Sequence, residues 1–543
     1  MRRKTREVMI GCVGVGGRNP VRIQSMTTSP TDSVRETVEQ IKLLADVGCE
    51  IARVTVQGVK EANACEEIKN SLIQQGYSIP LVADIHFFPK APMIVADFVD
   101  KIRINPGNYV DPRARFVQKE YDDASYAAEL ARIEDNFSPL VLKLKEQGKP
   151  MRIGTNHGSL SDRIMNRYGD SPAGMVESAL EYTRICRKLD YHNIIYSMKA
   201  SNTVVMIEAY RLLVRELDAL GWNYPLHLGV TEAGEGEDGR VKSAIGIGSL
   251  LLDGIGDTIR VSLTEDPWKE VAPCRQLVNL ADDYRKDLLG YQLHSRVEPR
   301  STPELLDPNL PSIHIEEALL AQTVSKFSLL PQADTPILVV SNSHWDSITQ
   351  FNPKQIIYQG DYGSARKFAL YIRQEGVDAR LFLGFAYSGP QELITIHASA
   401  ECGSLLVDGL FEGLAIDVSE NLALSILQGT RRKTVKTEFI SCPGCGRTLF
   451  DLQEVSKRIR KKTHHLPGVR IAIMGCIVNG PGEMADAHFG YVGSKPGKID
   501  LYIGKKCVER DVDFDQADEK LIELIKKEGM WQNPPFKKIS LSL

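Results

Sequence analysis

The chain has 543 residues, of which 43% are hydrophobic and 25% are charged, and its formal net charge is −4. This composition is typical of a globular protein of roughly two to four domains, and it gives no reason to expect a nucleic-acid partner. No apolar run reaches the ~18 residues of a membrane span, and the basic N-terminus lacks the apolar stretch of a secretory signal. We therefore expect a cytoplasmic protein with neither a membrane nor a nucleic-acid partner.

About the first 265 residues repeat one pattern, in which a β-branched run is followed by a turn and a helical stretch. Eight such runs alternate with helices, which is typical of parallel βαβ units. Their first residues are Val21, Glu50, Ile79, Asp100, Pro150, Asn193, Pro225 and Asp257. Eight units in about 250 residues predict a TIM barrel, with an open doubly wound sheet as the alternative. The long polar stretch from Tyr109 to Gly148 is expected to add a helix at the fourth unit.

The repeat ends near residue 290, where a proline-rich segment begins at Pro299. Beyond it, TPILVVSN, IIYQG and ARLFLGF predict buried strands, and SARKFALYIRQEG predicts a helix. This middle block has no cysteine cluster and no glycine-rich phosphate loop, so we interpret it as an inserted α/β domain that acts as a spacer. A third α/β unit follows. The predicted domains are residues 1–290, 291–433 and 434–543.

Seven of the ten cysteines are scattered singly and are expected to be small buried hydrophobes. The other three lie in two turns, Cys442 and Cys445 in SCPGCGR and Cys476 in MGCIVNGPGE. A CxxC pair alone suits a zinc half-site, a redox dithiol or an iron–sulfur ligand pair. Three thiolates with no fourth nearby suit a 4Fe-4S cluster whose last iron stays open to substrate.

Glu483, in NGPGE, is the candidate for a replaceable oxygen ligand at that last iron. A structural zinc site is the alternative, because zinc takes four firm ligands and a histidine could be the fourth. The histidines near enough in the sequence are His464, His465 and His488.

In a TIM barrel the active site lies at the carboxyl ends of the strands. Five cations occur there, and they would repel one another without a multiply charged anion among them; a diphosphate is such an anion. The cations are Arg53, Arg103, Arg152, Lys199 and Arg260. Asn105, Asn156 and Ser262 are polar residues at the same ends. Glu232 could handle a proton near a departing oxygen, and Asp84 and His86 could move protons or orient a neighbour.

SCPGCGR followed by MGCIVNGPGE is similar to the cluster motif of the hydroxymethylbutenyl diphosphate synthases. The segments SMTT, ADIHF, KIRINPGN, RIGTNHGSL, HLGVTEAG and GIGDTIRVSL also resemble that family, in the same order. The resemblance covers roughly residues 20–270 and 435–510, and the middle block resembles the longer, three-domain, plant-like form of the family.

The resemblance implies a reductive ring opening and dehydration in the non-mevalonate (methylerythritol phosphate) route to isoprenoids. The substrate is 2-C-methyl-D-erythritol 2,4-cyclodiphosphate, and the electron donor is ferredoxin or flavodoxin. It implies that Cys442, Cys445, Cys476 and Glu483 ligate a 4Fe-4S cluster, and that Glu232 lies near the reacting carbons. It assigns the substrate diphosphate to Arg53, Arg103, Arg152, Asn156, Lys199, Arg260 and Ser262.

Two other functions stay open. One is a zinc-stabilised phosphosugar-binding barrel without redox activity, and the other is a different iron–sulfur reductase, such as a relative of the sulfite reductases. The oligomeric state is also open, because barrel and cluster could meet within one chain or across a homodimer.

Overall fold

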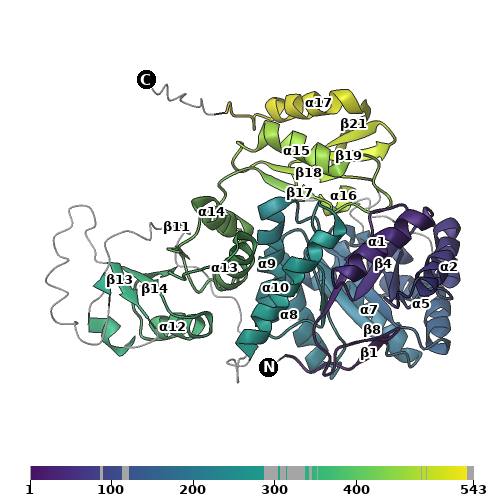
Figure 1. Cartoon of the computed structure of the whole chain (residues 1–543), viewed down its shortest axis with the longest axis horizontal. Helices are drawn as coiled ribbons and strands as arrows, with labels where there is room; N and C mark the ends of the chain where they lie inside the picture. Colours follow the sequence, from purple (N-terminus) through teal and green to yellow (C-terminus); the bar gives the residue numbers. More distant parts are fainter. Residues whose placement is uncertain are drawn as a thin grey trace.

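In the computed structural model, each predicted part of the chain contains one large sheet, and a separate two-stranded sheet precedes the first (Figure 1). The structure describes residues 2–85, 90–112, 121–285, 304–305, 313–314, 337–341, 345–350, 353–477, 480–484 and 486–534. The predicted site residue His86 lies outside these ranges.

The first sheet is the predicted barrel. Its eight strands run in the order β8-β7-β6-β5-β4-β3-β10-β9, and every pairing is parallel. A parallel bridge from Tyr196 to Leu226 joins the two ends, so the sheet closes and the doubly wound alternative is wrong. The strands are β3 (Arg22–Met26), β4 (Ile51–Val56), β5 (Leu81–Ile85), β6 (Lys101–Ile104), β7 (Met151–Asn156), β8 (Ile194–Lys199), β9 (His227–Leu228) and β10 (Thr258–Ile259).

Helices surround this sheet, as βαβ units require. They are α1 (Val34–Asp46), α2 (Val59–Gln74), α3 (Lys90–Val95), α5 (Asp123–Glu146), α7 (Pro172–Lys188), α8 (Thr203–Ala219), α9 (Gly236–Leu252) and α10 (Val271–Arg285). Short turns of helix lie in the connections, namely α4 (Pro106–Tyr109), η1 (His157–Ser159), α6 (Asp162–Tyr168) and η2 (Pro267–Glu270). The expected extra helix in the polar stretch of the fourth unit is α5.

A hairpin before the first barrel strand closes the floor of the barrel. It consists of β1 (Val8–Ile10) and β2 (Val13–Val15), paired antiparallel. Its apolar side chains form one cluster with three residues near the amino ends of the barrel strands, Ile51, Val82 and Ile195. The opposite end, where the strands finish, is therefore the open mouth.

The middle part is an α/β unit, as predicted. Its sheet is parallel throughout, in the order β11-β16-β15-β14-β13-β12. The strands are β11 (Glu304–Leu305), β12 (Ile313–His314), β13 (Ile337–Val340), β14 (Gln355–Tyr358), β15 (Arg380–Leu383) and β16 (Gly413–Leu414). The helices are η3 (Trp345–Gln350), α12 (Tyr362–Gln374), α13 (Gln391–Val407) and α14 (Glu420–Gly429).

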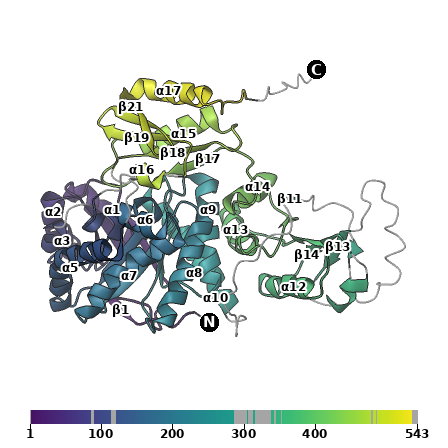
Figure 2. The same ribbon diagram turned by 180° about the vertical axis from the view of Figure 1, so that it is seen from behind.

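Helix α13 packs along α9 of the barrel, and both views show the two side by side (Figures 1 and 2). A Cβ atom on Gly403 would lie 2.6 Å from Cγ1 of Ile245, so glycine permits this close packing. Next to it, Arg211 donates to Asp408 at 2.6 Å and pairs with Asp253 at 2.6 Å. The middle part is thus anchored on the barrel by apolar packing and by buried charges.

The third part has a five-stranded mixed sheet, β17-β18-β19-β20-β21, parallel over its first three strands. It lies over the mouth of the barrel (Figure 1). Helix α17 buries Ala517, Leu521, Leu524 and Ile525 along one face. The elements are β17 (Glu438–Ser441), α15 (Leu452–Thr463), β18 (Arg470–Met474), α16 (Gly480–Glu483), β19 (Phe489–Lys495), β20 (Lys498–Ile503), β21 (Lys506–Asp513) and α17 (Phe514–Lys527).

Of the seven scattered cysteines, five are buried, but Cys12 is exposed and Cys507 is partly exposed. The prediction of burial is therefore wrong for these two.

No helix in the described part of the chain is long and apolar enough to cross a membrane.

Candidate active site

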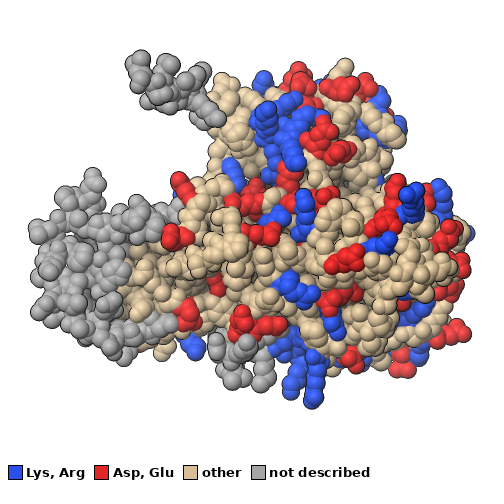
Figure 3. All heavy atoms as spheres, viewed as in Figure 1, with Lys and Arg blue, Asp and Glu red and all other residues tan. Residues whose placement is uncertain are grey.

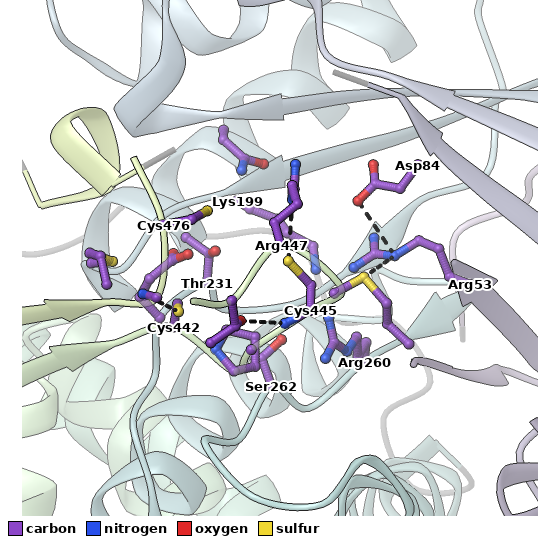
Figure 4. Close-up of a pocket in the computed structure, with 18 of the residues that line it drawn as sticks. Arg53, Asp84, Lys199, Thr231, Arg260, Ser262, Cys442, Cys445, Arg447 and Cys476 are labelled. Carbon is purple, nitrogen blue, oxygen red and sulfur yellow. Dashed lines mark hydrogen bonds and ion pairs between the residues drawn. The ribbon is translucent and has the colours of Figure 1, made fainter. Parts of the chain in front are cut away.

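A cavity lies between the barrel mouth and the C-terminal domain, and side chains from both line it (Figure 4). The barrel contributes the ends of its strands, and the C-terminal domain contributes the turns that follow β17 and β18. Most of the predicted site residues meet here. They are Arg53, Asp84, Arg103, Arg152, Asn156, Lys199, Glu232, Arg260, Ser262, Cys442, Cys445 and Cys476.

Two predicted residues lie beside the cavity without lining it. Asn105 caps α4 by accepting from the Gly107 amide at 3.3 Å, and its Nδ2 donates to Ser159 at 2.7 Å. Glu483 is buried and accepts a hydrogen bond from Nδ2 of Asn156 at 2.7 Å. Asn105 therefore does not line the cavity, and its substrate contact stays a prediction, whereas Glu483 is one hydrogen bond away from a lining residue.

Three of the five cations are held by neighbouring groups. Arg260 makes a two-pronged contact with Glu270, 2.8 Å from each nitrogen to an oxygen. Arg103 donates to Asp84 at 2.8 Å and to the Gly154 carbonyl at 2.8 Å. The same Asp84 carboxylate lies 3.8 Å from Arg53. Asp84 therefore orients two arginines, which is one of its two predicted roles.

Arg152 and Lys199 are less well compensated. Arg152 is 1% exposed, and its Nε and Nη1 atoms have no hydrogen-bond partner among the described residues. Burial and the neighbouring charges of Arg53 and Arg103 push the pKa of Arg152 well below its usual value. Burial and four surrounding arginines also push the pKa of Lys199 well below its usual value. Burial lowers the pKa of Arg53 to about 10. Each of these shifts would be reversed by a bound anion.

Two glycines inside the barrel leave room for these cations. A Cβ on Gly154 would lie 2.5 Å from Nε of Arg103, and one on Gly229 would lie 2.8 Å from Nζ of Lys199. Basic and acidic side chains are interspersed over the visible outer face (Figure 3). On this face the charges are mixed, whereas the described lining of the cavity brings five cations together.

Glu232 and Glu483 face each other across the domain boundary. Burial raises the pKa of both carboxyls, and the charge of Glu232 raises that of Glu483 further. Glu232 also has φ of 50°, a conformation that non-glycine residues adopt mainly where surrounding structure or function imposes it. Two such carboxyls in contact favour a state in which they hold a proton between them.

Three thiols form the wall of the cavity that belongs to the C-terminal domain. The Gly475 amide donates to Sγ of Cys442 at 3.3 Å, and Nε of Arg447 donates to Sγ of Cys445 at 3.2 Å. Among the described residues, no three His, Cys, Asp or Glu side chains converge on a point that one metal ion could occupy. His464, His465 and His488 do not line the cavity. A structural zinc site takes four firm ligands, and the described lining offers three thiols and no histidine, which suits an iron–sulfur cluster better.

The contacts that hold the two domains together come from a single chain. Ala233 and Ser441 form a parallel bridge, and Oγ1 of Thr264 donates to the Cys442 carbonyl at 2.9 Å. Nζ of Lys242 donates to the Phe439 carbonyl at 2.9 Å. In the described part of the structure, the barrel and the C-terminal domain of one chain are therefore closed on each other.

The sequence prediction did not single out eight residues that line the cavity, namely Met26, Thr231, Pro443, Gly444, Arg447, Thr448, Met474 and Gly475. Arg447 had a usable signal, because it follows Cys445 by two positions in SCPGCGR. Thr231 directly precedes Glu232. Met26 ends the first barrel strand and lies in the SMTT segment, so its position was a usable signal, whereas nothing in the sequence distinguishes Thr448 from an ordinary turn residue.

The sequence of this chain is similar to those of known proteins. The chain matches the GcpE TIM-barrel domain over residues 5–275 and the GcpE protein C-terminal domain over residues 438–527. It is 50% identical to a protein of Protochlamydia amoebophila named 4-hydroxy-3-methylbut-2-en-1-yl diphosphate synthase (flavodoxin), a match that covers 98% of this chain and 97% of that protein. The chain belongs to this family of synthases.

Plant members of the family match equally far along the chain. The chloroplastic ferredoxin form from Oryza sativa is 46% identical, and that from Arabidopsis thaliana is 44% identical. Each match covers 98% of this chain and 88% of the plant protein. Because these matches include the middle part, the resemblance to the longer, plant-like form is confirmed.

Proposed function

We propose that this synthase converts 2-C-methyl-D-erythritol 2,4-cyclodiphosphate to (E)-4-hydroxy-3-methylbut-2-enyl diphosphate. The reaction opens the ring at a carbon–oxygen bond, consumes two electrons and two protons, and releases one water. The observation that carries the proposal is that five buried cations and three thiols line one cavity.

The barrel side of the cavity binds the diphosphate. Arg152 offers two buried N–H groups that lack partners in the described structure, and planar guanidinium groups suit phosphate oxygens. Arg53, Arg103, Lys199 and Arg260 add positive charge around it, with Asn156 and Ser262 as neutral donors. The cations repel one another in the free protein, and a bound diphosphate relieves this repulsion. The relief contributes favourably to the free energy of diphosphate binding.

The opposite wall holds the cofactor in this proposal. Cys442, Cys445 and Cys476 would ligate a 4Fe-4S cluster, and Glu483 would be the ligand that substrate displaces. The cluster would supply Lewis acidity at one iron and electrons one at a time. Glu483 already hydrogen-bonds Asn156, which also lines the cavity, so its release would be coupled to substrate contacts on the barrel.

Glu232 is placed to move the proton that a departing oxygen needs. It lines the cavity between the cations and the thiols, and burial raises the pKa of its carboxyl, as suits an acid that must be protonated before it donates. Asp84 instead holds Arg103 and Arg53 in position. Closure of the C-terminal domain excludes water from reduced intermediates.

Electrons would come from ferredoxin or flavodoxin, the two donors that appear in the names of the relatives.

The middle part, residues 291–433, would act as a spacer. Helix α10 ends at Arg285, on the side of the barrel away from the mouth, whereas β17 begins over the mouth (Figure 1). The middle part carries the chain back, so one chain could complete the cavity without a homodimer.

The test is anaerobic turnover of the cyclodiphosphate with a chemical one-electron reductant, with iron and acid-labile sulfide measured on the same preparation. We expect about four irons and four sulfides per chain and release of the linear diphosphate. Zinc without sulfide would contradict the proposal, and so would a loaded cluster that leaves the cyclodiphosphate unchanged.

A further inference from the structure

Arg447 is the one charged side chain that the C-terminal domain contributes to the described lining of the cavity. It lies in the turn between β17 and α15 and reaches toward the barrel mouth (Figure 4). Its Nε donates to Sγ of Cys445 at 3.2 Å. Its Nη1 is shielded from solvent and has no hydrogen-bond partner among the described residues.

This arrangement leaves Nε bound to the sulfur and Nη1 available to a ligand. A buried N–H group without an acceptor is unfavourable, so an acceptor in the cavity is the expected partner. The guanidinium is planar and rigid, so its N–H groups keep a fixed relation to one another. Because Nε of Arg447 is bound to the sulfur of Cys445, the direction of the N–H groups on Nη1 is fixed as well.

We propose that Arg447 links the bound substrate to the sulfur of Cys445. It donates one N–H to the Cys445 thiolate and, when substrate binds, a second N–H to an anionic oxygen of the substrate. This inference rests on the proposed function, because it takes Cys445 to be a cluster ligand. Arg447 is then a substrate contact on the cofactor side of the cavity, opposite the cations of the barrel.

Two consequences follow from the two contacts. A hydrogen bond from a cation to a ligating sulfur withdraws electron density and makes the cluster easier to reduce. A contact to the substrate anion adds to diphosphate affinity even in protein without metal. A purely structural role, in which Arg447 only stabilises the turn, would produce neither effect on its own.

Arg447→Gln tests both consequences, with Arg447→Lys as the conservative variant. Lys461→Gln is the matched control, since it removes one exposed positive charge from α15 of the same domain. The first readout is calorimetric binding of inorganic diphosphate to metal-free protein. We expect about tenfold weaker binding in Arg447→Gln, partial recovery in Arg447→Lys, and no change in Lys461→Gln.

The second readout is a potentiometric titration of the reconstituted cluster, followed by electron paramagnetic resonance. At a fixed potential we expect the ratio of reduced to oxidised cluster to fall about tenfold in Arg447→Gln, which corresponds to ~59 mV for a one-electron couple. Lysine is a point donor that cannot serve both partners, so Arg447→Lys should keep most of this fall. Should Arg447→Gln not take up the cluster, Arg447→Lys carries the readout.

Unchanged diphosphate affinity in Arg447→Gln overturns the proposal, and so does an unchanged potential. Failure of the proposed function would look different, because the unmodified protein itself would then hold no iron and sulfide or would leave the cyclodiphosphate intact.

Discussion

Gly158 of the barrel and Gly482 of the C-terminal domain meet backbone to backbone. A Cβ atom on Gly482 would lie 1.5 Å from the carbonyl oxygen of Gly158, and one on Gly158 would lie 2.4 Å from the amide nitrogen of Glu483. Neither position has room for a side chain. The contact sets how far the C-terminal domain closes on the barrel, and it places Glu483 against Asn156.

Gly158→Ala should therefore hold the two domains apart while each stays folded. We expect turnover to fall by about 10²-fold, since a misplacement of about 1 Å between reacting groups has that effect. Steady-state turnover and limited proteolysis measure the two parts of this prediction. Gly58→Ala is the control, because a Cβ there would have Oε2 of Glu61 as its nearest neighbour, at 3.5 Å. Normal turnover in Gly158→Ala would show that the contact is not needed for closure.

Arg152→Lys should be costly although it keeps the positive charge. A lysine cannot reproduce the planar pair of N–H groups that Arg152 presents without partners. We expect a loss of about 2–4 kcal/mol in substrate binding, measured by calorimetry. Arg184→Lys, in an exposed pair with Glu177, should leave the affinity unchanged. Equal affinities in both variants would remove Arg152 from the diphosphate contacts.

Asp408→Asn should weaken the attachment of the middle part to the barrel. The Asp408 carboxylate accepts from Arg211 at 2.6 Å and pairs with Arg366, and all three side chains are largely buried. Removing one partner of a buried ion pair costs about 3–5 kcal/mol, because it leaves uncompensated charge. Calorimetric unfolding should show a lower midpoint, whereas Asp378→Asn, in an exposed pair with Lys354, should shift it little. Similar midpoints for the two variants would contradict an anchoring role.

Glu483→Gln should impair turnover far more than diphosphate affinity. The amide keeps an oxygen that can accept from Asn156, so closure is preserved, but the anion that we assign to the cluster is lost. The cluster should assemble on three cysteines and lose iron more easily in air. Electron paramagnetic resonance of the reduced protein, with and without substrate, should differ from that of the unmodified protein, whereas Glu454→Gln, at an exposed position of α15, should not change it. Identical spectra in both states would rule out Glu483 as a ligand.

Cys476→Ser should leave a folded barrel with a cluster that is absent or easily destroyed by oxygen. Only three thiols line the described cavity, so the loss of one leaves two. Iron and sulfide content after anaerobic reconstitution measures this, with circular dichroism as the check on folding. Cys507→Ser is the control, since that thiol lies on β21 outside the cavity lining. Full iron and sulfide content in Cys476→Ser would exclude Cys476 from the ligand set.

The predictions that held rest on local patterns. Each of the eight runs that predict barrel strands contains a strand of the barrel. The pattern is recognisable because a parallel strand buried on both faces is apolar and β-branched along its length. What the sequence did not show is how elements meet. Asn105 stands at the end of a barrel strand, but its side chain caps the next helical turn, and its substrate contact stays a prediction. The hairpin β1–β2 is short and was not predicted, and its place under the barrel depends on contacts with three distant strands.

The sequence by itself determined the barrel, the order of the three parts, and the chemical character of the site, because strand and helix periodicity and the residue types at strand ends are local properties. Only the tertiary structure decided that Glu483 lies on Asn156, 327 positions away in the chain, and that Arg447 joins the cavity. Those contacts depend on how the C-terminal domain packs on the barrel, through the bridge between Ala233 and Ser441 and through two glycines that let the backbones touch. Packing between distant surfaces is set by shape and volume over the whole interface, which no short stretch of sequence records.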